Sequence, residues 1–263
     1  MSVIIGAVLV GRAWAAEDRG KVLTLEVGDA VTLGNFTVED TTIDVETEYA
    51  NPQGCVELKL GNSPLSIGVS YAQSKNDFTG EWSGDIEDGD GAVTAERTDA
   101  NAYIRLGSRD SMNLRVGYRY FKYDFSDGLI VQRENGVVTE VDKNAEASGD
   151  LTTGIDAELN FVFGDAVQFG LGIGGTYFMD ADYTWEYDKV VGGSTTRQTG
   201  SATVNGYSAR LRPELSFKAG DSLRIFVNYT LQGTTWEGTP DNGKDYPGVD
   251  VYSAAAAGIR VML

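Results

Sequence analysis

The stretch GDLTTGIDAELNFVFGDAVQFGLGIGGTYFMDADY, residues 149–183, decides the fold. Mostly apolar residues occupy every second position in two arms, Leu151–Phe163 and Val167–Met179, which the tight turn Gly164-Asp165-Ala166 joins. A period of two is the pattern of a β-strand with one apolar face. An average strand has about five or six residues, whereas a tilted strand needs roughly nine to eleven to cross a bilayer. Both arms reach that length, so the stretch predicts a membrane-crossing β-hairpin.

The composition narrows the function classes. The 263 residues are rich in glycine (33) and tyrosine (13) and poor in proline (5), which suits a β-domain, and no linker divides them. A net charge of −18 argues against a nucleic-acid partner, because phosphate binding needs a surplus of Lys and Arg. Histidine is absent, which excludes Ser-His and Cys-His nucleophile pairs and the usual zinc sites. The single cysteine, Cys55, cannot form an internal disulfide and is interpreted as a small half-buried residue beside a turn.

The N-terminal region differs from the rest. Residues 2–10, SVIIGAVLV, form the only long apolar run, and Ala13-Trp14-Ala15-Ala16 follows. This pattern predicts a signal peptide-like segment over residues 1–16, with a buried N-terminal strand as the alternative. Residues 17–40 hold two short apolar pieces, VLTLEV and AVTLGNF, separated by Gly28-Asp29. We expect them to form a small periplasmic or lumenal segment, because neither piece is long enough to cross a bilayer.

From residue 41 to residue 263 alternating segments and turns follow one another regularly. They make about ten strands, and after the first hairpin the connections are short and long in turn. Short periplasmic turns and long extracellular loops are typical of outer-membrane barrels. We therefore predict an all-β fold, an antiparallel up-and-down transmembrane β-barrel over residues 41–263 in the bacterial outer membrane. The long extracellular loops are expected at residues 75–96, 124–147, 188–200 and 237–248.

Alternation alone does not say which face is inside. In a soluble secreted β-barrel or sandwich, which is the alternative, the apolar residues would be packed within and the charges would lie outside. The strand lengths, the loop asymmetry and the signal-like segment favour the membrane, where the apolar face meets lipid. So do aromatic residues near the strand ends, because such side chains gather at membrane interfaces. These residues are Tyr120, Tyr123, Tyr183, Trp185, Tyr187, Tyr207 and Trp236.

The polar face of the strands would then line the lumen. Its acids and bases nearly balance, so most of the negative charge must lie in loops and turns. Buried charges persist only when they are paired, and a narrow barrel lets side chains bridge across it, which predicts a largely plugged lumen. The predicted lumen-lining charges are Asp44, Glu46, Glu48, Glu57, Lys59, Arg105, Arg115, Arg119, Asp156, Glu158, Arg210, Arg212, Glu214, Arg224 and Arg260.

The C-terminal residues AAGIRVML, 256–263, resemble the terminal strand motif of bacterial outer-membrane β-barrels, which the barrel insertion machinery recognises. Gly258, Val261 and Leu263 match the motif, although Ala256 stands where a polar residue is usual and Leu263 where Phe is commoner. In its architecture the chain resembles the small porin-like and OmpA-like barrels. The resemblance implies the insertion machinery, outer-membrane lipid and lipopolysaccharide as partners.

Three functions follow as hypotheses. The first is an integral barrel with a structural role or slow passage of small solutes or ions, in which the lumen charges set any ion preference. The second is a surface adhesin or ligand-binding barrel that acts through its acidic extracellular loops. The third is an outer-membrane enzyme, but known barrel proteases, phospholipases and lipid A deacylases depend on a His that this chain lacks, so we predict no enzyme.

Calcium is the only cofactor that the sequence suggests. The run DIEDGDGAVTAE, residues 85–96, resembles a calcium-binding loop, although its Asp-Gly is displaced by one position. A solvated acidic loop is the alternative interpretation. The carboxylates that would serve as calcium ligands are Asp85, Glu87, Asp88, Asp90 and Glu96.

Overall fold

The computed structural model describes residues 22–32, 35–38, 41–46, 51–83, 87–240 and 246–263, and within them the regular structure is a sheet of twelve β-strands. No helix in this part of the chain is long and apolar enough to span a membrane. The strands are β1 (Leu23–Thr32), β2 (Asn35–Val38), β3 (Thr41–Glu46), β4 (Asn51–Lys59), β5 (Leu65–Ser83), β6 (Glu87–Gly107), β7 (Asn113–Glu134), β8 (Val137–Gly164), β9 (Val167–Val191), β10 (Ser194–Lys218), β11 (Leu223–Pro240) and β12 (Tyr246–Met262).

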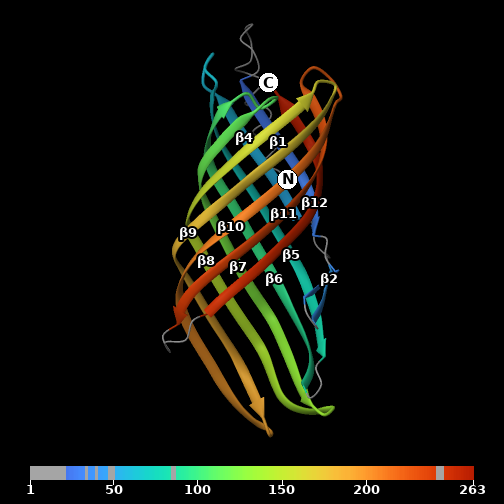
Figure 1. Ribbon diagram of the computed structural model, residues 1–263, viewed down its shortest axis with the longest axis vertical. Helices are drawn as coiled ribbons and strands as arrows, with labels where there is room; N and C mark the ends of the chain where they lie inside the picture. The colour runs from blue at the N-terminus through green and yellow to red at the C-terminus, as the bar shows by residue number, and fades with distance from the viewer. Residues whose placement is uncertain (1–21, 33–34, 39–40, 47–50, 84–86, 241–245) are drawn as a thin grey trace.

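The sheet closes into a barrel of antiparallel strands (Figure 1). From β4 to β12 each strand pairs with the next, and β1 pairs with both β12 and β4. Ten of the twelve strands, β1 and β4–β12, therefore form the closed ring. The remaining pair, β2 and β3, continues the wall where β3 pairs with β5. The predicted up-and-down barrel of about ten strands is confirmed.

The first strand corrects the expectation for residues 17–40, of which residues 17–21, 33–34 and 39–40 lie outside the described part. β1 is a strand of the barrel wall and not a separate periplasmic or lumenal segment. Gly28 divides the apolar pattern of the sequence, but it lies within the strand opposite Gly258 of β12. A Cβ on Gly28 would come within 2.8 Å of the Ala257 carbonyl oxygen. The glycine thus permits a close approach of two strands, and it does not separate two pieces as the sequence suggested.

The outer wall of the ring is apolar and the inner wall is polar. Ile104 is 48% exposed, whereas its neighbours Tyr103 and Arg105 are buried inside. An apolar band of this extent on a soluble protein would promote association, but hydrocarbon solvates it. A soluble barrel or sandwich would require the opposite arrangement. Other exposed members of the band are Val69, Val116, Ile155, Phe169, Ile173, Leu211, Ile225 and Ile259.

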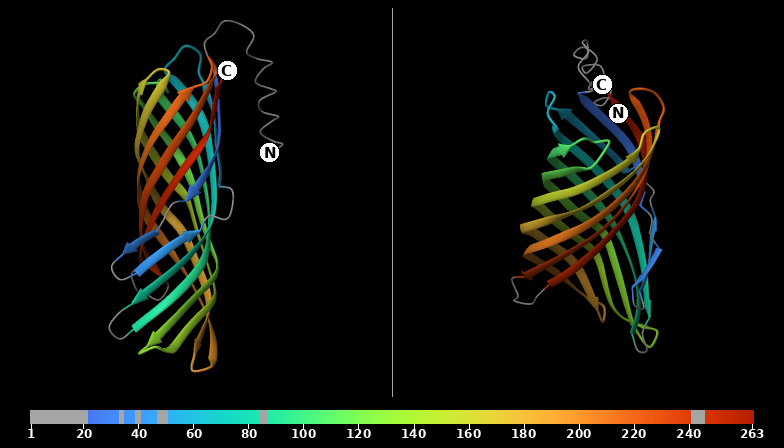
Figure 2. Two further views of the ribbon diagram at one scale, coloured as in Figure 1. Left: turned by 90° about the vertical axis from the view of Figure 1, so that its right-hand side faces the viewer. Right: turned by 45° about the horizontal axis from the view of Figure 1, so that its top comes forward.

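The strands are much longer than a bilayer requires. β7 has 22 residues, β8 has 28, and β9 and β10 have 25 each. The polar stretches predicted as extracellular loops 75–96, 124–147 and 188–200 are therefore mostly strand, and they extend the barrel as hairpins at its lower end in Figures 1 and 2. Two of these hairpins end in two-residue turns, Asn135-Gly136 and Gly192-Gly193, with positive φ at every turn residue. Such turns match the twist of the paired strands and let pairing continue to the tip.

A hydrophobic cluster fills the inside of this extension, and we call it the inner aromatic cluster. Its fully enclosed centre is formed by Phe121 of β7 and Phe178 of β9, whose rings stack at 5.9 Å. Tyr123, Tyr183 and Trp185, which were predicted at the membrane interface, pack in or against this cluster, so that prediction is wrong for them. Tyr207 does lie on the outer wall. The side chain of Trp236 lies outside the described part of the structure.

A bulge in β9 turns Tyr183 and Trp185, the aromatic residues that follow it on this strand, inward. Phe178 and Ala181 are both buried inside although they are three positions apart, so one extra residue lies between them. Asp180 is that irregular position: its φ is 49°, and the register with β10 shifts between Val204 and Gly206. After a bulge, the side chains that would have pointed outward point inward, and the reverse.

Candidate functional site in the barrel lumen

Three glycines leave the inner face of β9 without side chains, and we call them the glycine strip. Gly170, Gly172 and Gly174 take the inward positions of this strand, opposite β8 on one side and β10 on the other. A Cβ on Gly172 would come within 2.9 Å of Asn160 Oδ1. Because β9 has no inward-pointing side chain at these positions, arginines of β10 lie across it and reach carboxylates of β8.

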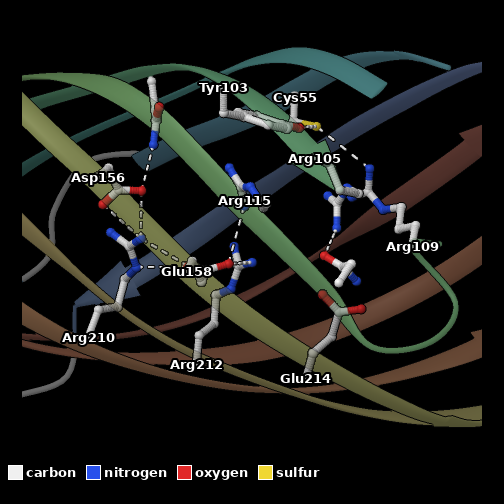
Figure 3. Close-up of polar contacts among 12 residues, drawn as sticks. Cys55, Tyr103, Arg105, Arg109, Arg115, Asp156, Glu158, Arg210, Arg212 and Glu214 are labelled. Carbon is white, nitrogen blue, oxygen red and sulfur yellow. Dashed lines mark hydrogen bonds and ion pairs between the residues drawn. The ribbon is translucent and has the colours of Figure 1, made fainter. Parts of the chain in front are cut away.

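Glu158 of β8 is the centre of the lumen network (Figure 3). Its carboxylate contacts three guanidinium groups: Arg115 of β7 at 3.3 Å, Arg210 of β10 at 3.0 Å and Arg212 of β10 at 2.8 Å. The residue is 1% exposed. Three cations around one buried anion more than compensate its charge.

Asp156 lies two residues earlier on the same inward face of β8. It accepts hydrogen bonds from Asn101 Nδ2 at 2.8 Å, from Thr176 Oγ1 at 2.6 Å and from Arg210 at 3.2 Å. Arg119 Nη1 stands 3.9 Å from the same carboxylate. The three donors come from β6, β9 and β10 and the ion-pair partner Arg119 comes from β7, so Asp156 links four strands around the lumen.

A second group of charges lies toward the inner aromatic cluster. Arg119 of β7 contacts Asp99 of β6 through two guanidinium nitrogens, one of them at 2.8 Å. Arg119 and Arg97 both donate to Gln232 Oε1 of β11, at 2.9 Å and 3.3 Å. The Arg97 guanidinium also lies 3.8 Å from the ring centre of Tyr252 of β12, which favours stacking. These contacts cross the barrel.

A third group lies near the short turns. Glu57 of β4 contacts Arg105 at 2.8 Å and accepts a hydrogen bond from the Tyr103 hydroxyl at 2.9 Å. Arg260 of β12 bridges Glu26 of β1 and Glu214 of β10, at 2.9 Å and 2.8 Å. Glu26 and Glu57 also share Arg109, which comes from the turn between β6 and β7.

Cys55 faces the lumen beside this third group. It is half-buried, as expected, but it lies within β4 and not beside a turn. Its sulfur lies 3.3 Å from the Tyr103 hydroxyl.

The structure brings most of the sequence-predicted lumen charges together. Lys59 is exposed at the end of β4 and joins none of the three groups. The side chains of Asp44, Glu46 and Glu48 lie outside the described part. Those placed inside the barrel are Glu57, Arg105, Arg115, Arg119, Asp156, Glu158, Arg210, Arg212, Glu214, Arg224 and Arg260.

Sequence reasoning missed four members of the network: Glu26, Arg97, Asp99 and Arg109. Arg97 and Asp99 could have been found by counting back in twos from Asn101 along the inward face of β6. Glu26 was assigned to a separate periplasmic or lumenal segment and not to the barrel wall, and Arg109 lies in a turn where alternation carries no information.

The carboxylates considered for calcium lie mostly on strand β6. Asp85 is outside the described part of the chain, as is the side chain of Glu87. Asp90 contacts Arg133, and Glu96 contacts Lys75 at 2.7 Å. Among the described residues no group of three or more His, Cys, Asp or Glu is arranged to hold a metal ion. The stretch expected as an acidic loop is paired with β5 and β7 along most of its length.

The C-terminal motif lies at the closure of the barrel. Gly258 pairs with Gly28, and the Leu263 amide donates to the Leu23 carbonyl at 2.8 Å. Gly258 and Val261 therefore belong to β12, the strand that seals the ring against β1, and Leu263 directly follows it.

A polar cavity of about 180 Å³ remains between the charged groups. Its lining includes the glycines Gly170 and Gly172, the amide of Asn160, and the arginines Arg115 and Arg212. The cavity lies over the glycine strip, where β9 offers only backbone.

Comparison with solved structures identifies the fold. The outer membrane protease OmpT from Escherichia coli is similar with a TM-score of 0.50 and 12% identity, covering 93% of this chain and 95% of that chain. The translocator domain of the autotransporter NalP from Neisseria meningitidis matches with a TM-score of 0.41 and 13% identity, covering 100% and 98%. CarO from Acinetobacter baumannii matches with a TM-score of 0.26 and 10% identity, covering 90% and 97%. No protein-family model matches the chain, and no curated protein matches it. The chain has the fold of bacterial outer-membrane β-barrels.

Proposed function

We propose that this chain is an integral outer-membrane barrel that is closed to solutes and serves as a rigid base for its extracellular hairpins. The observation that carries the proposal is the contact of Arg119 and Arg97 with Gln232. These side chains come from β7, β6 and β11, which lie on opposite sides of the ring, and Gln232 is fully enclosed. Side chains that meet across a narrow barrel leave no continuous water path at that height.

The inner aromatic cluster supports closure at a second height. Phe121 and Phe178 are both 0% exposed, and Arg97 lies 4.4 Å from the ring centre of Phe121. The charged layer thus lies directly against the aromatic layer. An ion would have to break buried ion pairs and then pass an apolar constriction, and apolar constrictions close pores by excluding water.

Planar-bilayer conductance tests the closed lumen. We expect no steady channels from the purified wild-type protein, and leak currents from the double variant Arg119→Ala, Gln232→Ala, which removes the contact across the barrel. The matched control is Leu231→Ala, the lipid-facing neighbour on β11, which should stay closed. Steady wild-type channels of defined size would refute the proposal.

A surface-binding role is the second candidate, because the hairpins continue far beyond the apolar band. Their surface is polar and ordered: Asn144 Nδ2 and Arg197 Nη1 donate to Asp188 at 2.9 Å and 3.1 Å. These hydrogen bonds hold the pKa of Asp188 below its usual value.

A hairpin truncation tests this candidate. Trp185 and Gly200 are register partners, so residues 186–199 can be replaced by an Asn-Gly turn without shifting the strands. We expect the truncated protein to insert into the membrane but to lose attachment of cells or ligands. Unchanged attachment would remove this hairpin from the candidate binding surface.

A further inference from the structure

The charges of the described lumen side chains do not balance. Eight arginines take part in the three groups described above, and they share six carboxylates, which leaves a surplus of two positive charges among the described side chains. The arginines are Arg97, Arg105, Arg109, Arg115, Arg119, Arg210, Arg212 and Arg260, and the carboxylates are Glu26, Glu57, Asp99, Asp156, Glu158 and Glu214. The whole chain carries −18. The surplus is therefore opposite in sign to the protein as a whole.

Arg224 adds a third positive charge. It is 5% exposed and donates to the backbone carbonyl of Asp165 at 2.9 Å. A carbonyl accepts the hydrogen bond but does not neutralise the charge. Buried cations without a counter-charge are strongly unfavourable, so the described part of the lumen favours an additional anion.

The surplus is concentrated at Glu158, which three guanidinium groups share. Arg115 is 8% exposed, and its Nε is a buried donor without a hydrogen-bond partner among the described residues. The Asn160 Nδ2 is also a buried donor without a hydrogen-bond partner among the described residues. A buried donor that is left without an acceptor destabilises the folded protein.

These unsatisfied donors belong to residues that line the cavity of about 180 Å³ above the glycine strip. Water could accept their hydrogen bonds, but it would leave the positive charge uncompensated. An anion satisfies both requirements, because it accepts hydrogen bonds and carries negative charge. A cavity of this volume has room for several water-sized groups.

We propose that the lumen binds a small inorganic anion, of the size of chloride or phosphate, between Arg115, Asn160 and Arg212. Arg212 is the most accessible of the three guanidinium groups on Glu158, with a side chain 29% exposed. Its position lets the anion exchange without breaking the pairs that hold the barrel together. The proposal goes beyond a closed lumen, because a barrel that leaked would still bind the anion.

Thermal unfolding of the full-length protein in detergent tests the site. Sodium chloride and sodium phosphate are titrated separately at constant ionic strength, with a bulky organic sulfonate as the replacement anion. We expect one of the two salts to raise the unfolding temperature by a few degrees over a hundredfold concentration range, because binding to the folded state alone stabilises it. No rise with either salt would overturn the proposal.

Two variants locate the effect. Arg115→Gln leaves Glu158 with Arg210 and Arg212, and we expect it to weaken the apparent anion affinity at least about tenfold, since charged hydrogen bonds of this kind are worth roughly 1.5–3 kcal/mol. Asn160→Ala removes only a neutral donor and should weaken the affinity less. The control Arg197→Gln, in an exposed ion pair outside the membrane, should respond like the wild type. An unchanged anion response in both lumen variants would refute the site, and Asn160→Ala supplies the result if Arg115→Gln does not fold.

Discussion

At the scale of single residues, Glu158 holds the lumen together. The three guanidinium groups around it are kept within 3.3 Å by its one negative charge. Replacing this carboxylate by an amide preserves the shape of the side chain but leaves the arginines facing one another. The effect of its substitution therefore measures electrostatic compensation and not packing.

We predict that Glu158→Gln lowers the free energy of unfolding by about 3–5 kcal/mol, the cost of breaking a buried charge pair by removing one partner. Urea unfolding in detergent, followed by heat-modifiable migration in gels, measures it. Glu186→Gln is the matched control: Glu186 pairs with Arg197 at 2.7 Å, but both side chains are exposed. We expect less than about 1 kcal/mol there. Equal losses would mean that the lumen is wetter than its burial indicates.

The glycine strip is the second determinant at this scale. A Cβ on Gly174 would lie 2.7 Å from the Ala157 carbonyl oxygen and 3.0 Å from Glu158 Cβ. We predict that Gly174→Ala destabilises the barrel by roughly 1–3 kcal/mol, because it displaces Glu158 from its arginines. Gly233→Ala on β11 is the control, since nothing lies within 4 Å of its added Cβ. The same unfolding assay should show that control close to wild type, and a neutral Gly174→Ala would contradict the role of the strip.

At the scale of the strand, the bulge at Asp180 decides what fills the extension. It turns Ala181 and the following aromatic residues of β9 inward, and the Asp180 amide donates to Asn205 Oδ1 of β10 at 3.0 Å. A non-glycine residue with positive φ is strained, and a β-branched one is strained most.

We therefore predict that Asp180→Val destabilises the protein by about 1–3 kcal/mol, whereas Asp180→Gly stays near wild type because glycine adopts this φ freely. Asp182→Val, at an exposed position two residues later, should have little effect. Trp185 packs against the inner aromatic cluster. With the other three tryptophans replaced by Phe, its fluorescence reports whether the residues after position 180 still point inward. A stable Asp180→Val protein with unchanged fluorescence would show that the bulge is not required.

The same bulge explains what could be predicted from the sequence. Regular alternation placed Arg115, Glu158 and Arg210 on the lumen face. Along a regular strand, odd and even positions point to opposite sides, so the residue number alone decides which side chains point inward. Tyr183 was placed on the wrong side, because the extra residue of the bulge exchanges inward and outward positions after it. Nothing in the amino-acid composition marks that extra residue. The contacts of Gln232 across the barrel were not predictable, because they depend on ring closure and on the lengths of several strands together.

At the scale of the whole molecule, the barrel has two unlike ends. The short turns, such as Ala219–Ser222 between β10 and β11, lie at one end together with the C-terminus, and the long hairpins project from the other (Figures 1 and 2). In outer-membrane barrels the short turns face the periplasm and the long connections face the exterior. The hairpin between β9 and β10 should therefore be reachable from outside the cell.

Labelling with a bulky, membrane-impermeant maleimide checks this orientation. The chain has one cysteine, so a Cys55→Ser background carries a single reporter. We predict that Ser194→Cys, exposed beside the tip of the β9–β10 hairpin, reacts on intact cells, whereas Asp221→Cys, exposed in a short turn, reacts only after the outer membrane is permeabilised. Both positions are polar and exposed, so the difference reports on which side of the membrane each residue lies and not local accessibility. Labelling of Asp221→Cys alone on intact cells would mean that the barrel is inserted in the opposite direction.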